Sequence, residues 1–227
     1  EGTIGELEAT VSCFDPANSQ NLYCDHFTRD VNNYNVIELL ETQTNRGGQK
    51  TTGFDTQIAF SAELPNLRAV NANLAWTHTS RNDVKELAFG TALRCAGRFG
   101  FPCNEAADGM TYPQDRVSAN VSYLSGDLGI YLNWRWIGGT DNAAFLVSEF
   151  LGTPDPDLVI TDIGSVSYLD MGVAYSLTEH FHARLNISNL LDRDPPLMAD
   201  AVVSNNTDTR LYDILGRSYS LTVTYQY

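Results

Sequence analysis

Four cysteines are the residues of this 227-residue chain whose type and spacing most directly suggest chemistry. Cys13 lies 11 residues before Cys24, and Cys95 lies 8 residues before Cys103, in polar stretches that contain Gly, Pro or Asn. Neither pair has the two-residue spacing or the histidines of a zinc site. We therefore expect two local disulfides, Cys13–Cys24 and Cys95–Cys103, formed in an oxidising compartment and each closing a short loop.

The other residues that could catalyse a reaction or hold a metal do not form a recognisable site. The four histidines are scattered, and no Gly-x-Ser-x-Gly element presents a serine nucleophile. A loop with Asp155, Asp157 and Asp162 lacks the Gly-centred ligand register of a calcium site. We expect that the protein is not an enzyme and that it uses no metal and no cofactor.

Several side chains remain as candidate ligand contacts. Arg135 and Arg184 fall on the polar side of alternating segments, where they could meet an anionic ligand or pair with a carboxylate such as Asp170; we favour pairing. Aromatic side chains in the long polar segments could stack on a sugar or an aromatic chelator, or could pack the loops together. These aromatic residues are Phe99, Phe101, Tyr112 and Phe145.

The last ten residues show the type of element that positions these side chains. Apolar or aromatic residues alternate there with small polar ones, and no charged residue occurs. Such alternation is typical of a transmembrane β-strand, with an apolar face toward lipid and a polar face toward the lumen. The apolar positions are Tyr219, Leu221, Val223, Tyr225 and Tyr227.

Seven segments of the chain alternate in this way, and short and long connections alternate between them. We predict antiparallel strands near residues 50–63, 66–79, 115–124, 127–138, 167–177, 180–189 and 217–227. Short turns on one side and long loops on the other are the arrangement of an outer-membrane barrel, with periplasmic turns and extracellular loops. The alternative is a soluble β-sandwich, whose loops are usually shorter. The predicted outward stripe includes Ile58, Trp76, Trp134, Trp136, Tyr175 and Tyr225.

Composition and strand number limit the remaining choices. The chain has 14 Lys and Arg against 28 Asp and Glu, a net charge of −14, which argues against a nucleic-acid partner. No apolar run approaches the roughly 20 residues of a membrane helix. Bacterial single-chain barrels have an even number of strands, so we expect the partner of the first strand to lie before Glu1.

Several stretches of sequence resemble one family, the TonB-dependent outer-membrane receptors. The sequences Asn-Leu-Leu-Asp-Arg-Asp-Pro-Pro at 189–196 and Leu-Tyr-Asp at 211–213 followed by Gly-Arg-Ser-Tyr at 216–219 are similar to the segment that closes these barrels. Gly-Phe-Asp at 53–55 is similar to the start of an earlier descending strand, and the cysteine-bearing loops resemble those of one branch. The resemblance spans nearly the whole chain.

The resemblance implies an all-β, antiparallel transmembrane barrel of about 22 strands, of which this chain is the C-terminal part. Residues 1–49 would be mainly extracellular loop and residues 50–227 seven strands with their loops. The plug domain and the TonB-contacting region would lie outside this chain. The resemblance also implies that Val223, Tyr225 and Tyr227 form a signal for the barrel assembly machinery.

The function that the resemblance implies is active transport across the bacterial outer membrane. The receptor would bind a scarce, bulky nutrient at its extracellular loops and import it with energy from TonB. Ferric siderophores, haem, cobalamin and oligosaccharides are the family's ligands. The alternative function is that of a passive barrel, or of a binding or adhesion protein that uses its loops without energised transport.

Overall fold

The computed structural model describes residues 2–3, 24, 27–33, 35–40, 43–44, 48–66, 68–85, 92–100, 103, 111–144, 160–198 and 206–226. The regular elements found there are β-strands. Within this part of the chain, no helix is long and apolar enough to cross a membrane.

The chain forms two compact units, residues 1–49 with 84–92, and residues 50–83 with 93–227. The first unit contains two small antiparallel pairs. In one pair, β1 (Gly2–Thr3) lies beside β4 (Gln43–Thr44); in the other, β2 (Phe27–Arg29) lies beside β3 (Val36–Leu39).

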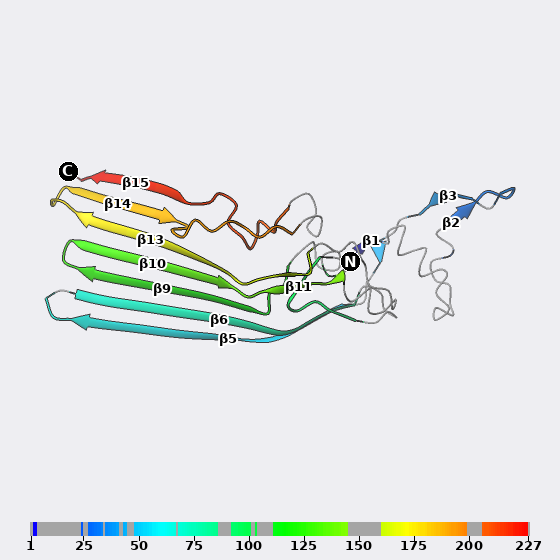
Figure 1. Cartoon of the computed structure of the whole chain (residues 1–227), viewed down its shortest axis with the longest axis horizontal. Coiled ribbons are helices and arrows are strands. Elements are labelled where there is room, and N and C mark those ends of the chain that lie inside the picture. The colour runs from blue at the N-terminus through cyan, green and yellow to red at the C-terminus, as the bar shows by residue number, and fades with distance from the viewer. Residues whose placement is uncertain are drawn as a thin grey trace. The chain divides into compact units, whose positions relative to one another are not determined.

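The second unit is built around one sheet with seven main strands in the order β15-β14-β13-β10-β9-β6-β5 (Figure 1). Each strand lies beside the strand that precedes it in this series along the chain, and the pairs from β6 to β15 are antiparallel. This arrangement confirms the predicted series. The strands are β5 (Gly48–Leu64), β6 (Arg68–Lys85), β9 (Asp115–Ser125), β10 (Leu128–Ile137), β13 (Val166–Ser176), β14 (Phe181–Ser188) and β15 (Ser218–Tyr225).

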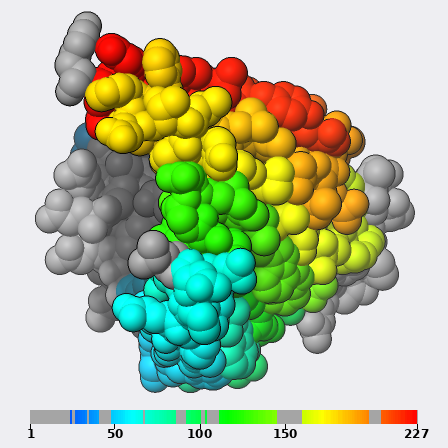
Figure 2. Space-filling view, turned by 90° about the vertical axis from the view of Figure 1, so that its left-hand side faces the viewer, coloured from blue at the N-terminus to red at the C-terminus, as the bar shows by residue number. Residues whose placement is uncertain are grey.

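Short turns and long connections lie at opposite ends of this sheet, as the sequence predicts. The turns after β5, β9 and β13 lie together at the end where the chain terminates (Figure 1). Figure 2 looks onto this end and shows the strands in chain order, from β5 in cyan to β15 in red. The sheet is open among the described residues, because β5 and β15 form its two edges.

Cross-strand register shows that the two faces of the sheet differ in polarity. Trp76 lies opposite Val117, which lies opposite Trp136, so these side chains share one face. The predicted outward residues therefore lie on the apolar face, and several of them are exposed: Ile58, Trp134, Tyr175 and Tyr225.

The opposite face carries the amides and hydroxyls. One row across the sheet joins four polar side chains, Asn73, Asn120, Asn133 and Asp170. Exposed apolar side chains on one face and polar ones on the other reverse the arrangement of a soluble domain. The predicted assignment of faces is confirmed, because a shift of one residue would have exchanged them.

Two features of the long connections differ from the sequence-based prediction. Strand β6 was expected to end near residue 79 but continues to Lys85. The connections also contain strands: β7 (Leu93–Arg94) pairs with β6, and a small sheet has the order β12 (Asp162–Ile163), β11 (Thr140–Asn142), β8 (Arg98–Phe99). In these segments the backbone forms strands, but apolar and polar residues do not alternate as they do in a strand with one apolar face. The sequence pattern therefore does not predict these strands.

Close approach of the β6 backbone explains why the Gly-Phe-Asp stretch at 53–55 begins with glycine. A Cβ at this position would clash with the His78 carbonyl oxygen of β6 and lie 3.1 Å from the Cα of Thr79. We expect Gly53→Ala to lower the free energy of unfolding by about 1–3 kcal/mol, because the two strands would have to separate locally. Thermal loss of the folded, heat-modifiable band on gels measures this effect. Gly164→Ala is the control, since nothing lies within 4 Å of its Cβ; equal stability of both variants would contradict the prediction.

Candidate functional site

The long connections are anchored by a cluster of buried side chains, which we call the loop core. Its members come from β8, β10, β12 and β13 and from the chain that follows β14. They are Phe99, Ile137, Ile163, Val166, Tyr168, Met198 and Tyr212.

Phe99 was one of the candidate ligand contacts, but its side chain has no solvent exposure. The sequence left open whether Phe99 contacts a ligand or packs the loops together, and in this structure it packs in the loop core. Tyr112 is half-buried and pairs with Arg98 through its backbone, donating to the Arg98 carbonyl at 3.1 Å. Phe101 and Phe145 lie outside the described residues.

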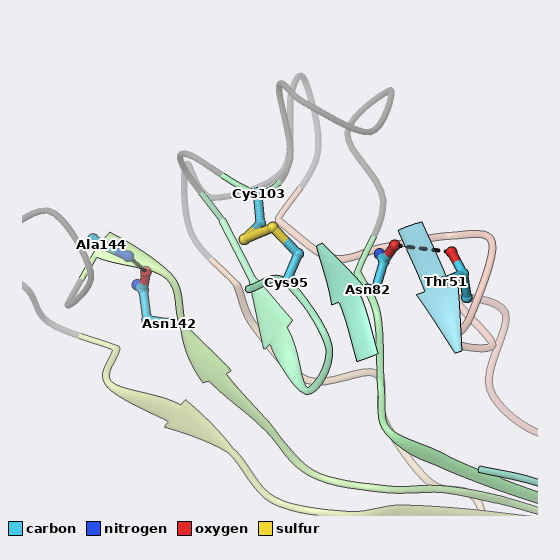
Figure 3. Close-up of a disulfide and its surroundings, with 6 residues drawn as sticks. All are labelled: Thr51, Asn82, Cys95, Cys103, Asn142 and Ala144. Carbon is cyan, nitrogen blue, oxygen red and sulfur yellow. Dashed lines mark hydrogen bonds between the residues drawn. A yellow bond between two sulfur atoms is a disulfide. The ribbon is translucent and has the colours of Figure 1, made fainter. Parts of the chain in front are cut away.

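A disulfide holds the connection between β6 and β9. Cys95 is bonded to Cys103, as predicted, and both residues are fully buried. The Cys95 N–H donates to the Asn82 carbonyl at 2.8 Å, and the Asn82 side chain accepts a hydrogen bond from Thr51 at 3.2 Å (Figure 3). The disulfide is thereby tied to the extended ends of β5 and β6.

Cys24 also takes part in a disulfide, whereas Cys13 lies outside the described residues. The Cys13–Cys24 bond therefore stays a prediction. Mass spectrometry of peptides from unreduced protein should find Cys13 linked to Cys24 and Cys95 linked to Cys103. A peptide that joins Cys24 to Cys95, or free thiols at Cys13, would contradict it.

The connection between β10 and β13 is closed by Asn142, a buried residue at the end of β11. Its Nδ2 donates to the carbonyl of Ile160 at 2.9 Å, and its Oδ1 accepts the N–H of Ala144 at 3.0 Å (Figure 3). One side chain therefore joins the two ends of this loop.

Arg135 lies at the centre of an ion-pair network on the polar face. Its Nη2 donates to Asp213 Oδ2 at 2.6 Å, and its Nε lies 3.9 Å from Asp170 Oδ2. The guanidinium also lies over the ring of Tyr168, 5.2 Å from the centroid, and the Tyr168 hydroxyl accepts the N–H of Asp213 at 3.2 Å. Carboxylate pairing of Arg135 is therefore observed, with Asp213 as a partner that the sequence did not identify.

Arg184 lies on the same face, further toward the turns. Its guanidinium lies over the ring of Tyr131, 5.0 Å from the centroid, and its cross-strand neighbour on β15 is Thr222. The polar wall between these two arginines forms a hollow of ≈ 330 Å³. Its lining includes Asn71, Asn73, Asn120, Tyr131, Asn133 and Asn186.

The two stretches that resemble the closing part of the family's barrels meet in space. Asn189 is fully buried with a positive φ of 50°, and its side-chain amide exchanges two hydrogen bonds of 2.9 Å with the backbone of Arg193. Asp192 accepts the N–H of Arg217 at 3.0 Å and forms an ion pair with its guanidinium at 3.4 Å. These residues shape the long connection between β14 and β15.

Residues 206–217, which we call the closing segment, are held to the loops by Asp208. This carboxylate is 2% exposed and accepts hydrogen bonds from the Thr111 N–H at 3.1 Å and from Arg210 Nε at 3.0 Å. Burial raises the pKa of Asp208, but the hydrogen bonds from Arg210 and Thr111 outweigh burial and hold its pKa below the ordinary value. Burial likewise raises the pKa of Tyr212 to about 12, so its hydroxyl stays neutral.

The predicted assembly residues Val223 and Tyr225 are exposed on the apolar face of β15. The Tyr225 ring lies 4.9 Å from that of Phe181 on β14. Tyr227 lies outside the described residues. In the part of the chain that the structure describes, no three His, Cys, Asp or Glu side chains are placed to hold a metal ion.

Comparison with solved structures finds receptors for siderophores. The siderophore receptor PirA from Acinetobacter baumannii is 15% identical, with a TM-score of 0.46 over 88% of this chain and 25% of that chain. The ferric enterobactin receptor PfeA from Pseudomonas aeruginosa is 11% identical, with a TM-score of 0.44 over 77% and 22% of the two chains. This chain therefore spans about a quarter of the length of these proteins.

Comparison with curated proteins finds no match. A family model described as "TonB dependent receptor-like, beta-barrel" matches residues 11–190, well over half of the chain. This chain therefore belongs to the TonB-dependent receptor β-barrel family of the bacterial outer membrane.

Proposed function

We propose that the protein is an active-transport receptor that binds a scarce, bulky nutrient at its extracellular loops and imports it with energy from TonB. The family consists of transport receptors. Ferric siderophores, haem, cobalamin and oligosaccharides are the ligand classes to test. We infer that the receptor acts by binding and transport rather than as an enzyme.

One observation carries this proposal, the separation of two different surfaces on one sheet. The apolar face exposes large side chains such as Ile58, Leu221 and Val223, which suits contact with outer-membrane lipid. The polar face is lined by amides, hydroxyls and Arg135, which suits a wet lumen. The described parts of the long connections and the loop core lie at one end of this lumen, where a nutrient from outside would first bind.

The partners that we propose come from membership of the family. TonB would act through a region that is not described here, and the barrel assembly machinery would recognise the end of β15. The charge of −14 and the absence of a basic stripe on the described strands argue against nucleic acid.

The test uses the full-length receptor in bacteria that lack their own receptors for the probes. Cells with and without TonB are supplied with iron-loaded siderophores, haem, cyanocobalamin or maltooligosaccharides, and uptake is measured with labelled probes. We expect one probe class to accumulate only in cells that have both the receptor and TonB. Equal uptake of the probe with and without TonB would instead identify a passive barrel. Binding of the probe to the cells without uptake would identify a loop-based binding protein.

A further inference from the structure

Three arginines line one hollow of ≈ 270 Å³ where β6, β9 and β10 meet the closing segment. They are Arg116 of β9, Arg135 of β10 and Arg210 of the closing segment. The hydroxyl residues Thr77 and Ser118 also line the hollow, and none of the described lining residues is acidic. This is a local exception in a chain with twice as many acidic as basic residues.

The three guanidinium groups differ in how far their charge is already neutralised. Arg135 forms an ion pair of 2.6 Å with Asp213, and Arg210 forms one of 3.0 Å with Asp208. Arg116 is exposed and has no ion-pair partner among the residues that the structure describes. Arg116 therefore supplies the uncompensated positive charge of the hollow.

The cross-strand register places Arg116 on the polar face of the sheet. It lies opposite Thr77 on β6 and opposite Ile137 on β10, and its neighbour Asp115 points to the other face. Asp115 is occupied there by hydrogen bonds of 2.9 Å from Trp76 and 2.8 Å with His78. The carboxylate next in sequence to Arg116 therefore does not neutralise it.

We propose that this hollow is a subsite for one anionic group of the transported nutrient, a carboxylate or a phosphate, with Arg116 as its anchor. This inference rests on the proposed function, because it assigns a ligand chemistry to the same lumen. A planar guanidinium matches the oxygens of a carboxylate or phosphate with two parallel hydrogen bonds. The volume of ≈ 270 Å³ is below the range of about 300–1,000 Å³ for small-molecule sites, so the hollow suits one charged group and not a whole bulky nutrient.

Asp213 limits the strength of this subsite. Asp213 binds Arg135 at a second hollow. The residues that line this second hollow include Arg135, Thr209, Tyr212 and Asp213. An anion bound at Arg116 competes with Asp213 for the donors of Arg135. Removal of the Asp213 charge should therefore strengthen anion binding, whereas removal of the Arg116 charge should weaken it.

Isothermal titration calorimetry of the detergent-solubilised, full-length receptor tests the subsite, with citrate and inorganic phosphate as probes at low ionic strength. We expect saturable binding of the anion, with an affinity that Arg116→Gln lowers by about tenfold or more. Arg116→Lys should lower the affinity less, because lysine keeps the positive charge but lacks the parallel N–H donors of the guanidinium. Asp213→Asn should strengthen binding severalfold. Arg68→Gln is the matched control, since Arg68 is an exposed arginine at the turn end of β6; it should leave the affinity within about twofold, as expected for a distant, screened charge.

Three outcomes would overturn the subsite. They are no saturable binding of either probe, equal weakening by Arg116→Gln and Arg68→Gln, and a lower melting temperature of Arg116→Gln with no change in affinity. The last result would show that Arg116 stabilises the receptor and does not bind the anion. None of these measurements requires TonB, so TonB-dependent uptake by a receptor that binds neither probe would remove the subsite and leave the proposed function intact.

Discussion

A receptor with Val223→Asp is expected to be nearly absent from the outer membrane, whereas a receptor with Thr222→Asp is expected to be present. The two residues are adjacent on β15 but lie on opposite faces of the sheet. Val223 lies opposite Ala183 and is 60% exposed on the apolar face. Thr222 lies opposite Arg184 on the polar face, where a carboxylate would have a cationic neighbour.

The physical reason is the medium that each face meets. A charged side chain on the lipid face of a transmembrane barrel costs up to about 2 kcal/mol for an acidic residue, and a lumen-facing one costs little. Val223 also belongs to the stripe that resembles the signal for barrel assembly, so insertion and recognition are both expected to fail. We expect a loss of heat-modifiable, surface-exposed receptor of about tenfold or more.

Outer-membrane fractionation followed by gels of unheated and heated samples measures this loss, and surface labelling provides a second readout. Deletion of Tyr227, which lies outside the described residues, should act in the same direction. Normal amounts of folded Val223→Asp receptor, or equal losses of both variants, would show that the assignment of the β15 faces is wrong.

The second large effect is expected at Asp208. Asp208→Ala removes an acceptor that the Thr111 N–H and Arg210 share, and leaves these donors without it. Leaving the buried Thr111 N–H without an acceptor costs about 1–3 kcal/mol of stability. The Arg210 side chain costs less, because it is 43% exposed and can be solvated by water. We therefore expect the closing segment to detach while the strands stay folded.

Limited proteolysis of the purified receptor measures detachment. Trypsin should cut after Arg210 about tenfold faster or more in Asp208→Ala, if local opening costs at least 1.4 kcal/mol less. Asp194→Asn is the control, because Asp194 is an exposed carboxylate in the same connection. Equal cleavage of the two variants, or cleavage within the barrel strands, would contradict this role of Asp208.

The same carboxylate determines how the closing segment responds to acid. The pKa of Asp208 in the folded protein lies below its value in the unfolded chain, so the stabilisation is present above the unfolded value and is lost as the pH falls through the folded one. Trypsin is inactive at acid pH. Cleavage of the closing segment of the wild type is therefore measured with pepsin. The closing segment should stay protected at mildly acidic pH and lose protection only below about pH 4.

The sequence by itself determined the seven main strands of the large sheet, their order and the two faces on which their side chains lie. Alternation with a period of two is a local property, and each of the seven main strands lies beside the main strand that precedes it along the chain, so neighbouring segments are sufficient to predict their order. The Cys95–Cys103 disulfide was predictable for the same reason, because its residues are close along the chain.

Only the tertiary structure decided which polar groups pair in the loops and the lumen. Arg135 meets Asp213 across 78 residues, and Asp208 meets the Thr111 backbone across 97 residues. Phe99, which could have contacted a ligand or packed the loops, is buried in the loop core, and Arg116 of the proposed subsite was not among the candidates from the sequence. These contacts depend on how irregular connections fold back over the strand ends, where no periodicity links sequence position to side-chain direction, so a local pattern cannot predict them.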